Sequence, residues 1–167
     1  YMLLDSYAPV RMAALDGLWD CGDEKLVDPI INLMVDDPVT EVKVAAARSL
    51  AHFLMMFEWA QFPGTKVPAI FGALRDTYED PETALPVKGA ALEAMGPLSH
   101  PKVSEFIEES FEGSSPELQL SALFAMGTSA DPRWLPILLD EMESPIAEMR
   151  AEAARAAGAI GSSESVS

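Results

Sequence analysis

Apolar residues recur along this chain with the spacing of amphipathic helices, in five segments that resemble one another. Within each segment the first, fifth, sixth and ninth columns are apolar, and the fifth column is always alanine. A helix places these columns on one face, so the pattern predicts five repeated helices that bury this face. The segments start at Val10, Val42, Val87, Leu118 and Met149, at spacings of 32, 45, 31 and 31 residues.

A second apolar segment follows each of the first four and has a proline at or near its start. These segments cover residues 26–35, 67–78, 103–111 and 134–142. Proline is tolerated in the first turn of a helix, because its missing N–H would have no partner there. Each unit is therefore predicted to be a helix, a short turn and a second helix, and no segment has the alternation of a strand.

Two kinds of punctuation mark the expected ends of the repeated helices. An aspartate or serine before a proline predicts an N-cap for the helix that follows, and a glycine after the ninth column predicts a helix end. The caps are expected at Asp37-Pro38, Asp80-Pro81, Ser115-Pro116 and Ser144-Pro145, and the ends at Gly96, Gly127 and Gly158.

The Asp-Pro or Ser-Pro turns, the Val-Arg/Lys-x-Ala-Ala core and the second helix with its proline resemble the HEAT-repeat family. Within that family they are most similar to the phycobilisome-lyase-type HEAT-like repeats. The resemblance implies an all-α fold, a right-handed α-solenoid of about five HEAT-like helical hairpins with the last incomplete. On this resemblance, residues 1–161 are expected to form a single repeat array with an insertion at about 52–64, and residues 162–167 a polar C-terminal tail.

Both ends of the sequence indicate a piece of a longer protein. Residues 1–6 resemble the end of a helix that begins upstream, and the first residue is not methionine. No second helix follows the last repeated helix, so its apolar edge is expected to be open, with a risk of weak self-association. That edge consists of Met149, Ala153, Ala157 and Ile160.

The long spacing between the second and third segments places extra residues at 52–64, rich in aromatic side chains and methionine. One interpretation is a lengthened helix whose apolar sides pack on its neighbours. The other is an exposed anchor for a partner, since insertions in repeat proteins often lie on one binding face. The candidate anchors are Phe57, Trp59 and Phe62.

Composition and charge exclude several classes of function. The chain has 167 residues, a net charge of −16 and a single cysteine. Phosphate binding needs clustered Lys and Arg, so neither nucleic acid nor an anionic membrane surface is an expected partner. One cysteine excludes an internal disulfide and a cysteine-based zinc site. No targeting signal is visible, so the expected location is cytoplasmic.

Residues for catalysis or metal binding are sparse. The two histidines, His52 and His100, are expected to pack on the helix surface and to support a turn or cap. Some HEAT-like hydroxylases bind iron through His-Glu pairs, and this sequence has no such dipeptide. Cys21 has no basic neighbour and is expected to be an incidental thiol. No nucleophile elbow, phosphate loop or dinucleotide fingerprint is present, so neither catalytic residues nor a cofactor or metal are predicted.

Acidic residues gather on the second helices, which line the concave side of a HEAT solenoid. In the third unit, four glutamates share the face opposite the apolar stripe, at i, i+3, i+4 and i+7. Further acidic residues cluster at the end of the fourth second helix, and others recur in the first two units at Asp28, Asp36, Asp76, Glu79 and Asp80. The candidate partner-binding residues are Glu105, Glu108, Glu109, Glu112, Asp140, Glu141 and Glu143.

The acidic face has two interpretations, a solvated surface that keeps the protein soluble or a dock for a basic protein segment. The favoured function is a non-catalytic protein–protein interaction scaffold or adaptor whose partner has a basic surface. Two alternatives remain open. The lyase-type resemblance implies a bilin lyase, a chaperone-like protein that attaches the chromophore to a protein substrate. The chain could also be a structural spacer within a larger protein.

Overall fold

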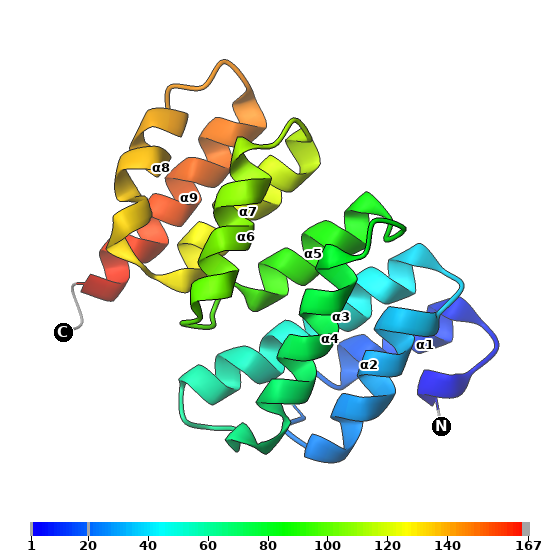
Figure 1. Cartoon of the computed structure of the whole chain (residues 1–167). Helices are drawn as coiled ribbons and strands as arrows, with labels where there is room; N and C mark the ends of the chain where they lie inside the picture. Colours follow the sequence, from blue (N-terminus) through cyan, green and yellow to red (C-terminus); the bar gives the residue numbers. More distant parts are fainter. Residues whose placement is uncertain (1, 20, 165–167) are drawn as a thin grey trace. The chain divides into compact units, whose positions relative to one another are not determined.

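The computed structural model describes residues 2–19 and 21–164, and every regular element among them is helical (Figure 1). The chain forms two compact units, residues 1–95 and 96–167. Unit 1 contains α1 (Ala8–Gly17), α2 (Val27–Asp36), α3 (Thr40–Glu58), α4 (Val67–Glu79) and α5 (Leu85–Met95), with 3-10 turns η1 (Met2–Leu4), η2 (Glu24–Leu26) and η3 (Gly64–Lys66). Unit 2 contains α6 (Pro101–Glu112), α7 (Pro116–Ser129), η4 (Pro132–Trp134), α8 (Leu135–Glu141) and α9 (Ala147–Glu164). The all-α prediction is therefore confirmed, and the handedness of the array stays a prediction.

The helices on either side of each short proline turn form the closely packed pairs within a unit. In unit 1, α2 packs against α3 and α4 against α5, and in unit 2, α6 packs against α7 and α8 against α9. The expected pairing of α1 with α2, α3 with α4 and α7 with α8 is much weaker. Short connections favour antiparallel neighbours, and in unit 1 the connections from α1 to α2 (residues 18–26) and from α3 to α4 (residues 59–66) are longer than the proline turns. Helix α9 therefore has a packing partner in α8.

The repeated helices also stack on one another, and small residues allow them to approach closely. In unit 1, α1 and α5 both pack on α3, and in unit 2, α9 packs on α7. The fifth-column alanines Ala46, Ala91, Ala122 and Ala153 are completely buried. A Cβ atom added at Gly127 would lie 2.8 Å from the Cα atom of Ala156. The repeated small residues thus set the spacing between stacked helices.

The glycine column does not end the helices as predicted. Gly96 follows the last residue of α5, but Gly127 lies inside α7 and Gly158 inside α9. For these two glycines the prediction of a helix end is wrong. At Gly127 the close approach of α9 explains the glycine, because a larger residue would meet the neighbouring backbone. The column therefore serves helix packing at Gly127, whereas a Cβ atom added at Gly158 would meet nothing within 4 Å.

Only one of the four predicted caps has the expected geometry. Ser115 is the N-cap of α7, and its hydroxyl accepts a hydrogen bond from the Leu118 amide at 3.4 Å. In the other turns the side-chain oxygen accepts from the amide two residues further on, and the helix begins later, at Thr40, Leu85 or Ala147. Those three side chains shape the proline turn instead of capping the helix, and they are Asp37, Asp80 and Ser144.

The predicted open edge of the last helix is wrong. Met149, Ala153 and Ile160 are at most 4% exposed and Ala157 is half-buried, because α9 packs against α7 and α8. This edge therefore gives no basis for self-association. Helix α9 also continues to Glu164, past the start of the expected tail at residue 162, and residues 165–167 lie outside the described part of the chain. The extent of the single array and of the tail stays a prediction.

Candidate protein-binding surface

Helix α6 carries the predicted acidic residues on one exposed face. Its opposite face is anchored by Val103, Phe106 and Ile107, which are at most 2% exposed. The helix starts at Pro101, and the Nδ1 atom of His100 caps it by accepting a hydrogen bond from the Lys102 amide at 3.1 Å. We define the α6 acidic face as the four exposed side chains of Glu105, Glu108, Glu109 and Glu112.

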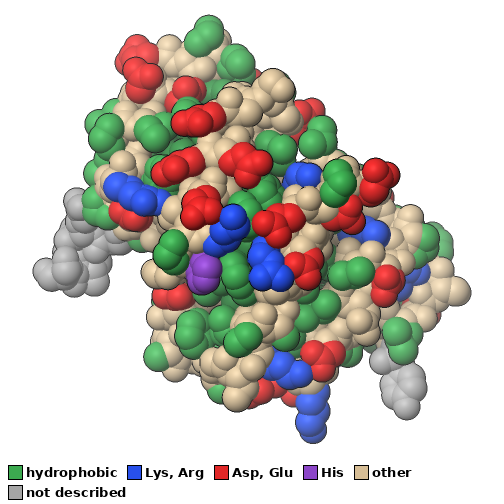
Figure 2. Space-filling model, in the orientation of Figure 1, with side chains coloured by type: hydrophobic (Ala, Val, Ile, Leu, Met, Phe, Trp, Pro, Cys, Tyr) green, Lys and Arg blue, Asp and Glu red, His purple; other side chains and the backbone are tan. Residues whose placement is uncertain are grey.

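Little positive charge offsets the α6 acidic face. The ammonium group of Lys102 lies 3.0 Å from a carboxylate oxygen of Glu105, and the two side chains are 43% and 62% exposed. Among the described residues, no ion pair involves Glu108, Glu109 or Glu112. Figure 2 shows acidic side chains gathered over α6 and α8. The face therefore presents negative charge to solvent, as the sequence predicts.

The second acidic group lies where α8 ends. Asp140 and Glu143 are exposed, and Glu141 is half-buried. Asp140 and Glu141 are the last two residues of α8, where the carbonyl ends of the helix are already negative. Carboxylates at this position oppose the helix dipole, and a bound cation would relieve that opposition. Unit 2 thus contains all seven predicted acidic residues.

A groove of about 460 Å³ adjoins the start of α6 and touches the acidic face. Its apolar lining includes Val103, Ile107 and Trp134, and its rim carries Glu105 and Glu108. The rim also holds an ion pair from η4, in which Arg133 lies 3.2 Å from Asp131 and 4.3 Å over the Trp134 ring. The acidic face is therefore continuous with an apolar hollow.

The predicted aromatic anchors lie in unit 1, apart from the acidic set in sequence, and they differ in exposure. Trp59 is 61% exposed, directly after α3, and Phe57 is half-buried. Phe62 is only 5% exposed and packs edge-on against Phe53, with ring centroids 5.1 Å apart. Phe62 is therefore part of the core, and its prediction as an exposed anchor is wrong. Trp59 stays a candidate.

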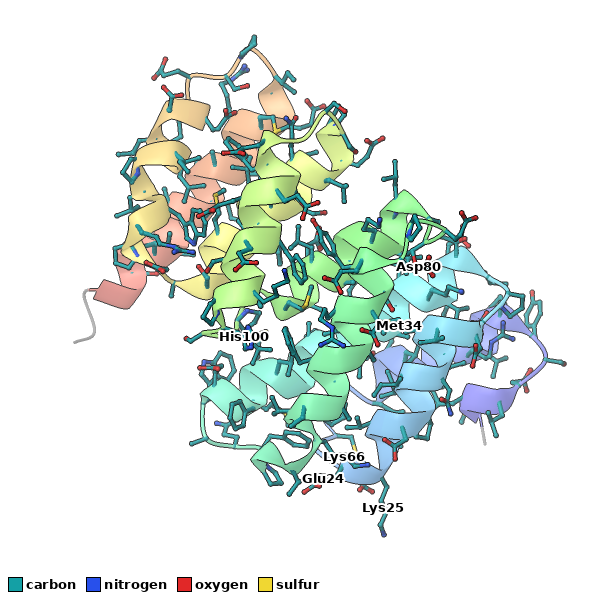
Figure 3. All side chains as sticks on the ribbon, in the orientation of Figure 1. Glu24, Lys25, Met34, Lys66, Asp80 and His100 are labelled. Atoms are coloured by element: carbon teal, nitrogen blue, oxygen red, sulfur yellow. The ribbon has the colours of Figure 1, made fainter. Side chains whose placement is uncertain are left out.

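The segment after the insertion is attached to the start of α2. The Thr65 hydroxyl donates to Glu24 at 2.8 Å, and the Lys66 ammonium lies 2.8 Å from Asp28. Figure 3 shows Glu24 and Lys66 at the same end of unit 1. These contacts join η3 to η2 and α2, so the insertion is fixed at its C-terminal side. Asp28 is consequently engaged within the protein.

A buried ion pair that the sequence reasoning missed joins α1 to the turn before α3. The Arg11 guanidinium donates to both carboxylate oxygens of Asp37, at 2.7 and 2.9 Å, and to the carbonyl of Asp5 at 2.7 Å. The Asp37 side chain is 2% exposed. Burial raises the pKa of Asp37, but hydrogen bonds from Arg11 and the Val39 amide, with the Arg11 charge, outweigh it and lower the pKa. The available sequence signal for this ion pair was the basic residue in the second column of the repeat, which is Arg11 in the first segment.

The histidines have the roles that the sequence predicts. The His52 ring stacks on Trp19 with ring centroids 4.6 Å apart, and His100 caps α6. Within residues 2–19 and 21–164 no group of three or more His, Cys, Asp or Glu is arranged to hold a metal ion. In the same residues, no helix is long and apolar enough to cross a bilayer.

Comparison with known proteins agrees with the helical architecture. Residues 103–167 match the model of the HEAT repeats family, and the predicted resemblance to HEAT-repeat proteins is thereby confirmed. The lyase-type subtype stays a prediction. The chain is also similar to deoxyhypusine hydroxylase of Mus musculus, with 33% identity over 94 residues. That alignment covers 55% of this chain and 31% of the hydroxylase, so the chain spans less than a third of this relative.

Proposed function

We propose that this chain is a non-catalytic protein-interaction module that docks a basic segment of a partner protein on the α6 acidic face. The observation that carries the proposal is the set of four exposed glutamates on one face of α6, with Lys102 as the neighbouring cation. The HEAT architecture supports it, since extended arrays of helical repeats provide interaction surfaces. The acidic end of α8 in the same unit adds to the negative field.

Such a dock works mainly through long-range attraction. Clustered carboxylates steer a basic partner and raise its association rate, while each exposed ion pair contributes only about 0.2–1 kcal/mol. Salt screens these interactions, because the Debye length is only about 8 Å at physiological ionic strength. The groove beside Glu105 and Glu108 offers an apolar contact to a partner that also has a hydrophobic side chain. Affinity on this surface is therefore expected to fall with salt.

The activity of the similar hydroxylase is not carried over to this chain. The chain spans 31% of that protein, and both histidines engage in local contacts, His52 with Trp19 and His100 with the Lys102 amide. No described contact favours bilin attachment or a purely structural spacer over docking. A cytoplasmic location, suggested by the sequence, belongs to the proposal.

The test is capture of partner proteins on the immobilised chain. The test variant changes the four glutamates of the α6 acidic face to lysine. A control variant changes four exposed carboxylates elsewhere to lysine, so that its net charge equals that of the test variant. These residues are Asp16, Glu41, Glu58 and Glu148. We expect a basic protein that the wild type and the control retain, that the test variant loses, and that modest salt releases. Equal retention by all three chains would contradict the proposal.

A further inference from the structure

Unit 1 contains a second surface that the proposed function does not use, an electronegative groove of about 930 Å³. It opens where the C-terminal ends of α2 and α4 meet the turns that lead into α3 and α5. Figure 3 labels Met34 and Asp80, which line it. Met34 and Val87 form part of a buried apolar base. We propose that this groove binds an extended, lysine-bearing segment of a partner protein.

The carboxylates of the groove exceed its cations. Asp36, Asp80 and Glu82 are exposed on its lining, and no ion pair among the described residues involves them. The remaining lining carboxylates are engaged, Asp37 with Arg11 and Asp76 with Arg75 at 2.7 Å each. The groove therefore keeps negative charge after its internal pairs are counted.

The helix ends add to this charge, and one of them shows how an ammonium group is held. The carbonyl ends of α2 and α4 both face the groove region and carry partial negative charge. At α2, the Lys43 ammonium donates to the Val35 carbonyl at 2.7 Å. The last turn of α4 contains no basic residue. A lysine from a partner would complement the end of α4 as Lys43 complements the end of α2.

Thr77 is an independent sign that the groove accepts a polar ligand. Its side chain lines the groove, the residue is only 9% exposed, and its hydroxyl has no hydrogen-bond partner among the residues that the structure describes. No completely buried side-chain nitrogen or oxygen among the described residues lacks a partner, so the hydroxyl keeps access to solvent at the groove. Nearly buried polar groups are normally satisfied. A bound ammonium group could donate to this oxygen.

The spacing of the charges favours a segment over a single ion. No three carboxylates of the described residues are close enough together to hold a metal ion. Separated carboxylates match separated ammonium groups on an extended chain, and lysine carries its charge on a flexible stem that can reach into a groove. The proposal concerns unit 1 and does not depend on the α6 acidic face of unit 2.

The test uses a fluorescein-labelled peptide of alternating glycine and lysine as the probe, at low salt. The full chain carries the charge-reversed α6 acidic face as background, which removes binding there. Three variants are compared with this background: Asp36→Asn/Asp80→Asn/Glu82→Gln, Thr77→Val, and the control Asp16→Asn/Glu58→Gln/Glu148→Gln. Circular dichroism verifies that each is folded.

We expect the groove triple variant to weaken peptide binding about fivefold, since three exposed charge interactions are lost. Thr77→Val should weaken it about twofold without changing its salt dependence, because only a neutral hydrogen bond is removed. The control should stay within about twofold of the background. In NMR titrations, the amide signals of Lys43, Thr77 and Glu82 should shift. Equal weakening by the control, no effect of the groove variants, or no binding of the probe would overturn the proposal.

Discussion

The close packing of α7 against α9 predicts that replacing glycine by alanine has opposite effects on stability at two equivalent positions. Gly127 and Gly158 occupy the same column of successive repeats, and both lie inside helices. A Cβ atom at Gly127 would lie 2.8 Å from the backbone Cα of Ala156, whereas a Cβ at Gly158 meets nothing within 4 Å. The two substitutions to alanine therefore differ in the packing of one methyl group.

Two contributions to the free energy of unfolding decide the outcome. Replacing glycine by alanine inside a helix stabilises it by about 1 kcal/mol. Inserting a methyl group against close-packed backbone costs about 1–3 kcal/mol. Only the first contribution acts at Gly158, so Gly158→Ala should stabilise the protein by up to about 1 kcal/mol. Both act at Gly127, so Gly127→Ala should destabilise it by up to about 2 kcal/mol.

The assay is urea unfolding followed by far-ultraviolet circular dichroism, with both variants measured beside the wild type. Native-state hydrogen exchange in α7 and α9 assigns any loss to this contact. The expected difference between the variants is about 1–3 kcal/mol, the cost of the added methyl group, which a midpoint shift resolves. If both substitutions stabilised the protein equally, the close approach of α9 to α7 would be refuted.

Three further predictions concern unit 1. Asp37→Ala should lower the free energy of unfolding by about 3–5 kcal/mol, because Arg11 would stay buried without its partner, and urea unfolding measures the loss. The pKa of Asp37 is lowered in the fold, so its contribution is complete above the unfolded pKa of about 4 and disappears as the pH falls through the folded value. In acid titrations Asp37→Asn should therefore lose stability less steeply than the wild type below about pH 4, and parallel curves would contradict this. Phe62→Ala should cost about 3–5 kcal/mol, whereas Trp59→Ala should change stability by less than about 0.5 kcal/mol, again by urea unfolding.

The sequence predicts the helices well because each one carries its own periodic pattern. The predicted second helix at 67–78 corresponds to α4 (Val67–Glu79), and the predicted 103–111 corresponds to α6 (Pro101–Glu112). The pairing of helices was harder to predict, since an apolar stripe fits either neighbour. The length of the turns separates the two choices in unit 1 but not at α8, whose connections to α7 (residues 130–134) and to α9 (residues 142–146) are equally long. Whether a glycine of the repeated column ends a helix was also hard to predict, because Gly127 lies against Ala156 of another helix, α9.

The candidate surface was also predictable only in part from the sequence. The exposure of Glu105 and Glu108 follows from the period of α6 alone, so the sequence was sufficient to predict it. The groove beside them needs Trp134 from η4, and the burial of Phe62 needs Phe53 from α3. The pair of Arg11 and Asp37 joins residues 26 positions apart. Local periodicity contains no information about such contacts.

The most direct test of docking on the α6 acidic face is the salt dependence of affinity for the captured partner. Dissociation constants are measured over a salt series for the wild type, the variant with the four α6 glutamates changed to lysine, and the control with four other carboxylates reversed. The account predicts a steep loss of affinity with salt for the wild type and the control, and weak binding with a flat or inverted slope for the α6 variant. Equal affinities and slopes for the wild type and the α6 variant would contradict it.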